Sequence, residues 1–151
     1  MARSRLLTAP KTVERYWAPM SRANLARAHE VIDAVERRDL DALIELTDPD
    51  VEWRSAFVAG TGGVYRGHAG MREYVRDMKD AWDIVRLDVD HEIGVGDIVV
   101  FVGRIHYRGK GSGVEDETES GYVLKFAEGK VVGFRPFRDP EAALEAVGLQ
   151  P

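Results

Sequence analysis

Cysteine is absent from the 151 residues of this chain. Its absence excludes disulfide bonds, cysteine nucleophiles, zinc–thiolate sites and iron–sulfur clusters. The redox compartment stays open, because a chain without cysteine suits an oxidising or a reducing environment equally well.

Long apolar runs are missing as well. No stretch approaches the ~18 uninterrupted apolar residues that a membrane-spanning helix needs. Near the N-terminus only Leu6 and Leu7 form an apolar pair, which is too short for a secretory signal. We therefore expect a cytoplasmic protein with no membrane partner.

The chain also lacks an excess of positive charge. Lysine and arginine together number 21 against 26 aspartates and glutamates, which gives a net charge of −5. Such a field repels phosphate backbones, and no basic stripe offsets it, so we expect no nucleic-acid partner.

Known metal, nucleotide and nucleophile motifs are missing too. The four histidines, at positions 29, 68, 91 and 106, show neither HxH nor HxxxH spacing, so no metal site is predicted. The glycine-rich segment 109–113 lacks the spacing of a phosphate-binding loop, and no serine stands in a GxSxG setting. We expect a protein that works without a cofactor.

What is present is the composition of one folded domain. Hydrophobic residues make up 44% of the chain and charged residues 31%, a mixture typical of globular proteins. We find no repeat and no linker. Residues 1–20 are interpreted as a lead-in segment, in which Pro10 and Pro19 bracket a short helical candidate, and residues 21–150 as a single domain.

Hydrophobic periodicity and capping residues predict an α+β fold. Apolar residues recur at helical spacing between Ser21 and Arg38, and Asp39 can cap the next helix. The predicted helices span 21–38, 40–47 and 69–82, with a last one that begins at Asp139-Pro140-Glu141 and ends at Gly148. A loop is predicted over 56–67, and strands over 51–55, 85–93, 98–107, 117–126 and 130–137.

One predicted strand also indicates what covers the two faces of the sheet. The segment Ile98–Val102 is apolar on both faces, so neither face can lie in water. One face must meet the helices. For the other we predict a second copy of the chain, and hence a homodimer through the outer face of the sheet. The alternative is that a long loop or the N-terminal segment covers that face.

Several motifs resemble the SnoaL-like branch of the nuclear-transport-factor-2-like superfamily, which includes polyketide cyclases and relatives of ketosteroid isomerase. The resemblance covers about residues 22–149 and rests on the segments 39–43, 49–53, 65–68, 129–135 and 139–149. It implies a cone: a curved antiparallel sheet wrapped around helices (a cystatin-like α+β roll), with a mostly apolar pocket inside. It does not imply an activity, because this fold hosts enzymes and non-enzymes alike.

The catalytic groups of two related enzymes are missing. The tyrosine and the two carboxylic acids of ketosteroid isomerase fall near Val31, Trp53 and Tyr122. None of these three side chains can take over its role. The Asp–Arg–Asp set of limonene epoxide hydrolase falls on three residues that also lack the chemistry, namely Gly103, Ile105 and Pro136.

Aromatic and apolar residues on the helix and strand faces that turn inward form the candidate pocket. A cavity lined in this way would take a flat apolar ligand; the alternative is that the same side chains simply pack the core. The candidate ligand-binding residues are Trp53, Met78, Trp82, Phe101, Tyr107, Tyr122, Leu124 and Phe134.

Four polar residues are weak candidates for catalysis. His29 lies beside the apolar stripe of the first helix, and His91 shares its strand parity with apolar neighbours, so either can serve as a base or as a hydrogen-bonded boundary residue. Glu119 turns inward only if the register slips by one residue, and otherwise faces water. Arg138 can meet a ligand anion or form an ion pair on the surface.

Three functions remain open from the sequence. The first is a small-molecule binder with an aromatic pocket. The second is a cofactor-independent cyclase, isomerase or hydratase with a non-standard acid–base set, which needs only a positioned base and an oxyanion donor. The third is a protein-interaction module whose cone is filled by its own side chains.

Overall fold

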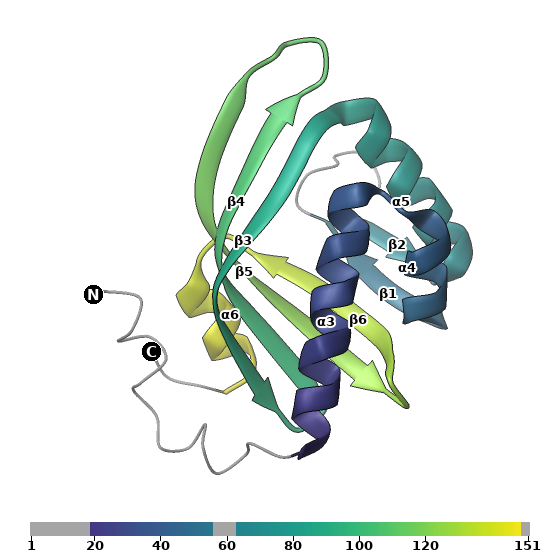
Figure 1. Cartoon of the computed structure of the whole chain (residues 1–151), viewed down its shortest axis with the longest axis vertical. Coiled ribbons are helices and arrows are strands. Elements are labelled where there is room, and N and C mark those ends of the chain that lie inside the picture. The colour runs from purple at the N-terminus through teal and green to yellow at the C-terminus, as the bar shows by residue number, and fades with distance from the viewer. Residues whose placement is uncertain (1–18, 56–62, 149–151) are drawn as a thin grey trace.

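A computed structural model describes residues 19–55 and 63–148 of the chain. One sheet of six strands curves around three helices, and a fourth helix lies on its other face (Figure 1). The helices are α3 (Pro19–Arg37), α4 (Leu40–Leu46), α5 (Gly67–Ala81) and α6 (Pro140–Ala146). The strands are β1 (Thr47–Arg54), β2 (Val64–Arg66), β3 (Trp82–Val95), β4 (Ile98–Gly109), β5 (Glu115–Ala127) and β6 (Lys130–Phe137).

The predicted α+β cone is confirmed, and the strands lie in the order β2-β1-β6-β5-β4-β3. One pair departs from the antiparallel pattern, because β1 runs parallel to β6. β1 also begins at Thr47, earlier than predicted, and runs through Pro49. Proline is tolerated there because the β1–β6 register is irregular between Thr47 and Glu52. The short strand β2 lies within the segment that was predicted as a loop.

Capping residues fix where two helices begin. The Asp39 side chain accepts a hydrogen bond from the backbone N–H of Ala42 at 3.1 Å and caps α4. Asp139 does the same for the N–H of Ala142 at 2.8 Å, so α6 begins where the sequence predicted it. Between α3 and α4 the chain turns sharply at Arg38, which adopts the left-handed conformation with φ 54°.

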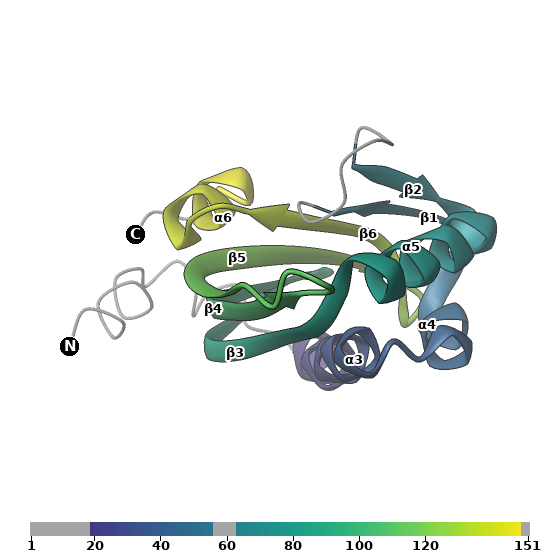
Figure 2. The same cartoon turned by 90° about the horizontal axis from the view of Figure 1, so that it is seen from above.

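The core lies on the concave face of the sheet, under α3, α4 and α5 (Figure 2). Side chains from all three helices are fully buried there, including Val31, Leu43 and Met71. From the sheet, Trp53 of β1 stacks on Phe134 of β6 with ring centroids 4.0 Å apart. Burial of these groups, at about 1.5–3 kcal/mol for each large side chain, holds the helices inside the cone.

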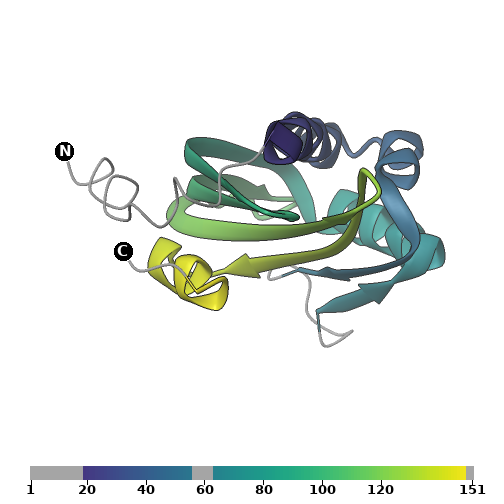
Figure 3. The same cartoon turned by 90° about the horizontal axis from the view of Figure 1, so that it is seen from below.

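The convex face of the sheet is covered in part by α6, which lies on the side opposite α3 (Figure 3). Ala143 and Leu144 of α6 pack against Val100 and Val102 of β4, which are 0% and 2% exposed. The second apolar face of this strand therefore meets a helix of the same chain. The expectation that a second copy, a loop or the N-terminal segment must cover it overlooked α6.

Two further points concern the ends of the chain and its surroundings. The helical candidate between Pro10 and Pro19 lies outside the described residues except for Pro19, where α3 begins. Among the described residues, no helix is both long and apolar enough to cross a membrane.

The packing of α6 on the sheet depends on a glycine. A Cβ added at Gly121 of β5 would lie 2.6 Å from the Cβ of Ala143, too close for any real contact. We expect Gly121→Ala to lower the free energy of unfolding by about 1–3 kcal/mol, because overpacking forces the helix away from the sheet.

Urea denaturation measures this loss, and Gly133→Ala is the matched control. Gly133 lies on the neighbouring strand, and the nearest atom to its added Cβ would be 3.8 Å away, an ordinary contact. Equal midpoints for the two variants would contradict the proposed role of Gly121.

Candidate functional site

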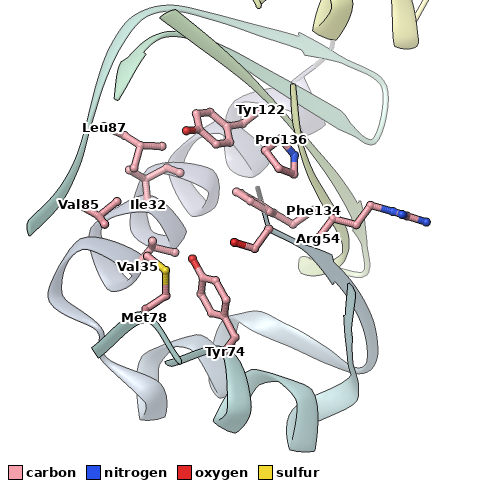
Figure 4. Close-up of a pocket in the computed structure, with 11 residues that line it drawn as sticks. Ile32, Val35, Arg54, Tyr74, Met78, Val85, Leu87, Tyr122, Phe134 and Pro136 are labelled. Carbon is pink, nitrogen blue, oxygen red and sulfur yellow. The ribbon is translucent and has the colours of Figure 1, made fainter. Parts of the chain in front are cut away.

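A narrow cavity lies inside the cone, between the helices and the sheet (Figure 4). Its volume is about 20 Å³, little more than one water molecule needs. The residues that line it are Ile32, Val35, Arg54, Ser55, Tyr74, Met78, Val85, Leu87, Tyr122, Phe134 and Pro136.

Most of the cavity wall is apolar. Ile32 and Val35 of α3 lie one turn apart and face Val85 and Leu87 of β3, while Met78 projects from α5 (Figure 4). Phe134 and Pro136 close the wall from β6. An apolar enclosure of this kind favours a ligand with an apolar body.

Two tyrosine hydroxyls supply polarity. Tyr74 of α5 and Tyr122 of β5 are 4% and 5% exposed, and they enter the cavity from opposite sides (Figure 4). Burial raises the pKa of Tyr122 to about 12, with a smaller opposing effect of the Ser120 hydroxyl. Burial also raises the pKa of Tyr74 far above its ordinary value. Both phenols are therefore neutral at pH 7 and can donate hydrogen bonds.

The titratable groups of the lining are phenols and a guanidinium. Among the described residues that line the cavity, none is a carboxylate or an imidazole. Arg54 contributes to the wall, but its guanidinium points away from the cavity (Figure 4) and pairs with Glu52 at 3.1 Å. The lining can therefore contact an apolar group and donate hydrogen bonds to an oxygen atom.

The structure brings three of the predicted pocket residues to the cavity: Met78, Tyr122 and Phe134. Trp53 and Leu124 are fully buried in the core and do not line the cavity. Trp53 lies behind Phe134, against which it stacks.

The other three predicted pocket residues lie elsewhere. Phe101 is buried against the ring of His29, with centroids 4.9 Å apart. Trp82 and Tyr107 form an edge-to-face pair at 5.3 Å where β3 begins and β4 ends. None of these three side chains lines the cavity.

The two histidine candidates lie outside the cavity, on an open groove that they share. His29 is exposed and its Nε2 pairs with Glu92. The register of β3 shifts between Val89 and His91, so that His91 lies opposite Val102, a residue of the cluster under α6. The shift breaks the strand parity that led us to expect His91 on the inner face.

The remaining two candidates for catalysis are exposed. Glu119 alternates with the buried residues Ser120 and Tyr122 and is paired in register with Arg104 of β4, so the slip that would turn it inward does not occur. Arg138 follows the end of β6 and is exposed. Neither of them lines the cavity.

Tyr74 is the cavity residue that the sequence reasoning missed most plainly. It lies four residues before Met78 on α5, and residues at this spacing share one face of a helix. Because Met78 was a candidate, the residue one turn earlier on the same helix face could have been found by the same spacing.

Comparison with known proteins gives a consistent result. A family model described as the SnoaL-like domain matches residues 28–134. No curated protein matches the chain.

Several solved structures share the fold. An NTF2-like protein of unknown function from Burkholderia pseudomallei is 24% identical, with a TM-score of 0.69 over 83% of this chain and 98% of that one. TerC, co-crystallised with polyporic acid, is 24% identical, with a TM-score of 0.68 over 80% and 94%. A hypothetical protein with a ketosteroid isomerase-like fold from Catenulispora acidiphila, in complex with trimethylamine, is 13% identical, with a TM-score of 0.65 over 82% and 92%.

The buried phenols make the fold sensitive to alkali. Their folded-state pKa values lie above the unfolded value of about 10, so the stabilisation is complete below pH 10 and is lost as the pH rises towards 12. We expect Tyr122→Phe to remove about 1 kcal/mol of the stability difference between pH 8 and pH 11, since only one pH unit lies above the unfolded pKa, at about 1.4 kcal/mol per unit.

Urea denaturation at the two pH values measures this difference. Phe126→Leu is the control, because Phe126 is a buried ring without an ionisable group and should change the stability equally at both pH values. An unchanged pH dependence in Tyr122→Phe would show that the phenol ionises freely in the folded protein.

Proposed function

This chain belongs to the SnoaL-like domain family, and from that premise we propose that it binds a flat, apolar small molecule inside its cone. The observation that carries the proposal is the cavity lining, in which apolar side chains surround two neutral phenols. Residues 21–150 form the binding unit in this proposal, and residues 1–20 a lead-in to it. The cytoplasmic location expected from the sequence stays a prediction.

The narrowness of the cavity limits what it can bind. Its volume is about 20 Å³, so a ligand enters only if lining side chains move, and a flat molecule needs the smallest movement. Met78 lies on the wall, and methionine side chains adapt to a ligand at low cost. Two proteins of the same fold have been crystallised with small molecules, polyporic acid and trimethylamine.

A second candidate function is favoured by the same narrowness. If side chains fill the cone in solution, the protein is an interaction module and its cavity takes no ligand. The remaining alternative, a cofactor-independent cyclase, isomerase or hydratase, draws less support from the lining, because His29, His91, Glu119 and Arg138 all lie outside it.

A thermal-shift screen against flat aromatics, steroids and terpenoids tests the proposal. A ligand at 100 times its dissociation constant stabilises the protein by about 2.7 kcal/mol, which raises the melting temperature measurably. We expect the hit to lose its effect in Val85→Phe, because the larger ring occupies the cavity.

The matched control is Ile84→Phe, the adjacent residue, which is 37% exposed and does not line the cavity. This variant should respond to the ligand as the native protein does. If no compound shifts the melting temperature and Val85→Phe is itself strongly destabilised, the cone has no room and the interaction module is the better description.

We also propose that two chains associate through the outer face of the sheet. Beside α6, four apolar side chains of that face stay partly exposed, namely Val95, Ile98, Val123 and Phe137. Apolar area that one chain leaves uncovered is available to an identical copy by two-fold symmetry.

Sedimentation equilibrium tests the association. We expect twice the chain mass of 16.9 kDa, and the mass of one chain for Val123→Glu, because a buried unpaired carboxylate opposes the contact. Val114→Glu is the control, since Val114 is 65% exposed near the start of β5. A native protein that sediments as a single chain would refute the dimer.

A further inference from the structure

A groove lies on the outer face of the sheet, away from the cavity inside the cone. Its volume is about 240 Å³, and residues of β1, β6 and β5 line it. Gly133 leaves space in the groove, because the nearest atom to a Cβ added there would be the Cβ of Lys125, 3.8 Å away. Val123 forms part of the wall and is also one of the partly exposed apolar side chains beside α6. The groove is therefore continuous with that apolar surface.

The groove is positively charged, although the chain as a whole carries a net charge of −5. One acid lines it, Glu52, which already pairs with Arg54 at 3.1 Å. Lys125 and Arg135 line it as well and form no ion pair with any described residue. The guanidinium of Arg135 instead lies over the ring of Phe137, 4.8 Å from its centroid. Two cations of the groove are thus left without a carboxylate.

The neighbouring helix α6 carries the opposite charge. Glu141 and Glu145 are exposed, whereas Ala143 and Leu144 are buried against the sheet. Residues four apart share one face of a helix, so the two carboxylates lie together on the side that points away from the sheet. Within the described part of the chain, neither of them forms an ion pair. We refer to Glu141 and Glu145 as the acidic face of α6.

The groove and the acidic face of α6 are neighbours that do not meet within one chain. In the β5–β6 pair, Phe137 lies opposite Gly121, where α6 packs, and Arg135 lies opposite Val123, two residues further along. The outer face thus carries α6 and, beside it, the uncovered strands β6 and β1 (Figure 2). The close contact between Ala143 and Gly121 fixes the helix on the sheet, so its acids cannot reach the groove of the same chain.

Other acids of the outer face are already paired. Glu117 of β5 pairs with Arg104 at 2.9 Å and contacts His106 at 3.0 Å. Glu115 pairs with Arg108 at 3.5 Å. These carboxylates would have to give up partners in order to enter a basic groove, whereas those of α6 would not. The acidic face of α6 is therefore the better match.

We propose that two copies of this chain associate with α6 of each copy seated on the groove of the other, so that Glu141 and Glu145 meet Lys125 and Arg135. A two-fold axis makes every such contact twice. The inference rests on the proposed association of two chains and adds its orientation. Exposed ion pairs contribute little to affinity, whereas like charges in contact strongly oppose binding. The charges therefore select the orientation, and the apolar side chains supply the attraction.

Two charge-reversed variants test the orientation. The groove variant is Lys125→Glu with Arg135→Glu, and the helix variant is Glu141→Lys with Glu145→Lys. Either variant alone brings like charges together at both contacts, so we expect sedimentation equilibrium to give an association about 100-fold weaker than that of the native protein. An equal mixture of the two variants has opposite charges at both contacts. We expect the mixture to recover the native association.

The matched control is Arg72→Glu with Lys79→Glu. Both residues are exposed on α5, which lies on the concave side of the sheet, and the change in net charge equals that of the groove variant (Figure 2). This control should associate as the native protein does. Circular dichroism establishes that all variants fold, since every substituted side chain is exposed.

The possible results separate the orientation from the association itself. If the groove variant associates like the native protein, or the mixture stays as single chains, the proposed orientation is wrong while the association of two chains stands. Equal weakening in the control also overturns it, because the effect then comes from net charge alone. A native protein that sediments as a single chain overturns both proposals and leaves the groove to an acidic partner other than this chain.

Discussion

The cone depends on one close contact between two strands. At Gly103 of β4 a Cβ would lie 2.0 Å from the backbone oxygen of Asp88 on the neighbouring strand β3. Only glycine therefore fits at this position. The register of β3 shifts by one residue at the same place, between Val89 and His91. An extra residue in one strand bends a sheet and increases its twist. The bend lets a single sheet face wrap the helices and leaves a cavity between them.

The helices and strands could be predicted from the sequence because capping residues and hydrophobic periodicity agreed with the fold. Asp39 and Asp139 cap the helices that they were expected to cap, and the segment 98–102 is buried on both faces as its composition requires. The register shift in β3 could not be predicted, because Ile93 beyond the shift is apolar and belongs to the cluster under α6, so the alternation shows no break. His91 was therefore expected on the wrong face. The cover by α6 was missed for a different reason: the helix was predicted, but where it packs depends on contacts between distant residues.

The candidate site was likewise predicted only in part. Aromatic residues on the inward faces of helices and strands were expected to line a pocket. An inward position alone, however, does not distinguish a residue of the cavity wall from one in the core behind it. Trp53 and Phe134 illustrate this, since they stack face to face and only Phe134 reaches the cavity. Of the two phenols in the lining, Tyr122 was a candidate from the sequence and Tyr74 was not.

The turn between α3 and α4 carries a residue whose backbone conformation lowers the stability of the fold. Arg38 adopts φ 54°, which costs a residue with a side chain about 1–2 kcal/mol and costs glycine almost nothing. Selection of variants for heat resistance alone would thus favour glycine at this turn. The chain therefore keeps an arginine at a turn where its backbone would be more stable with glycine.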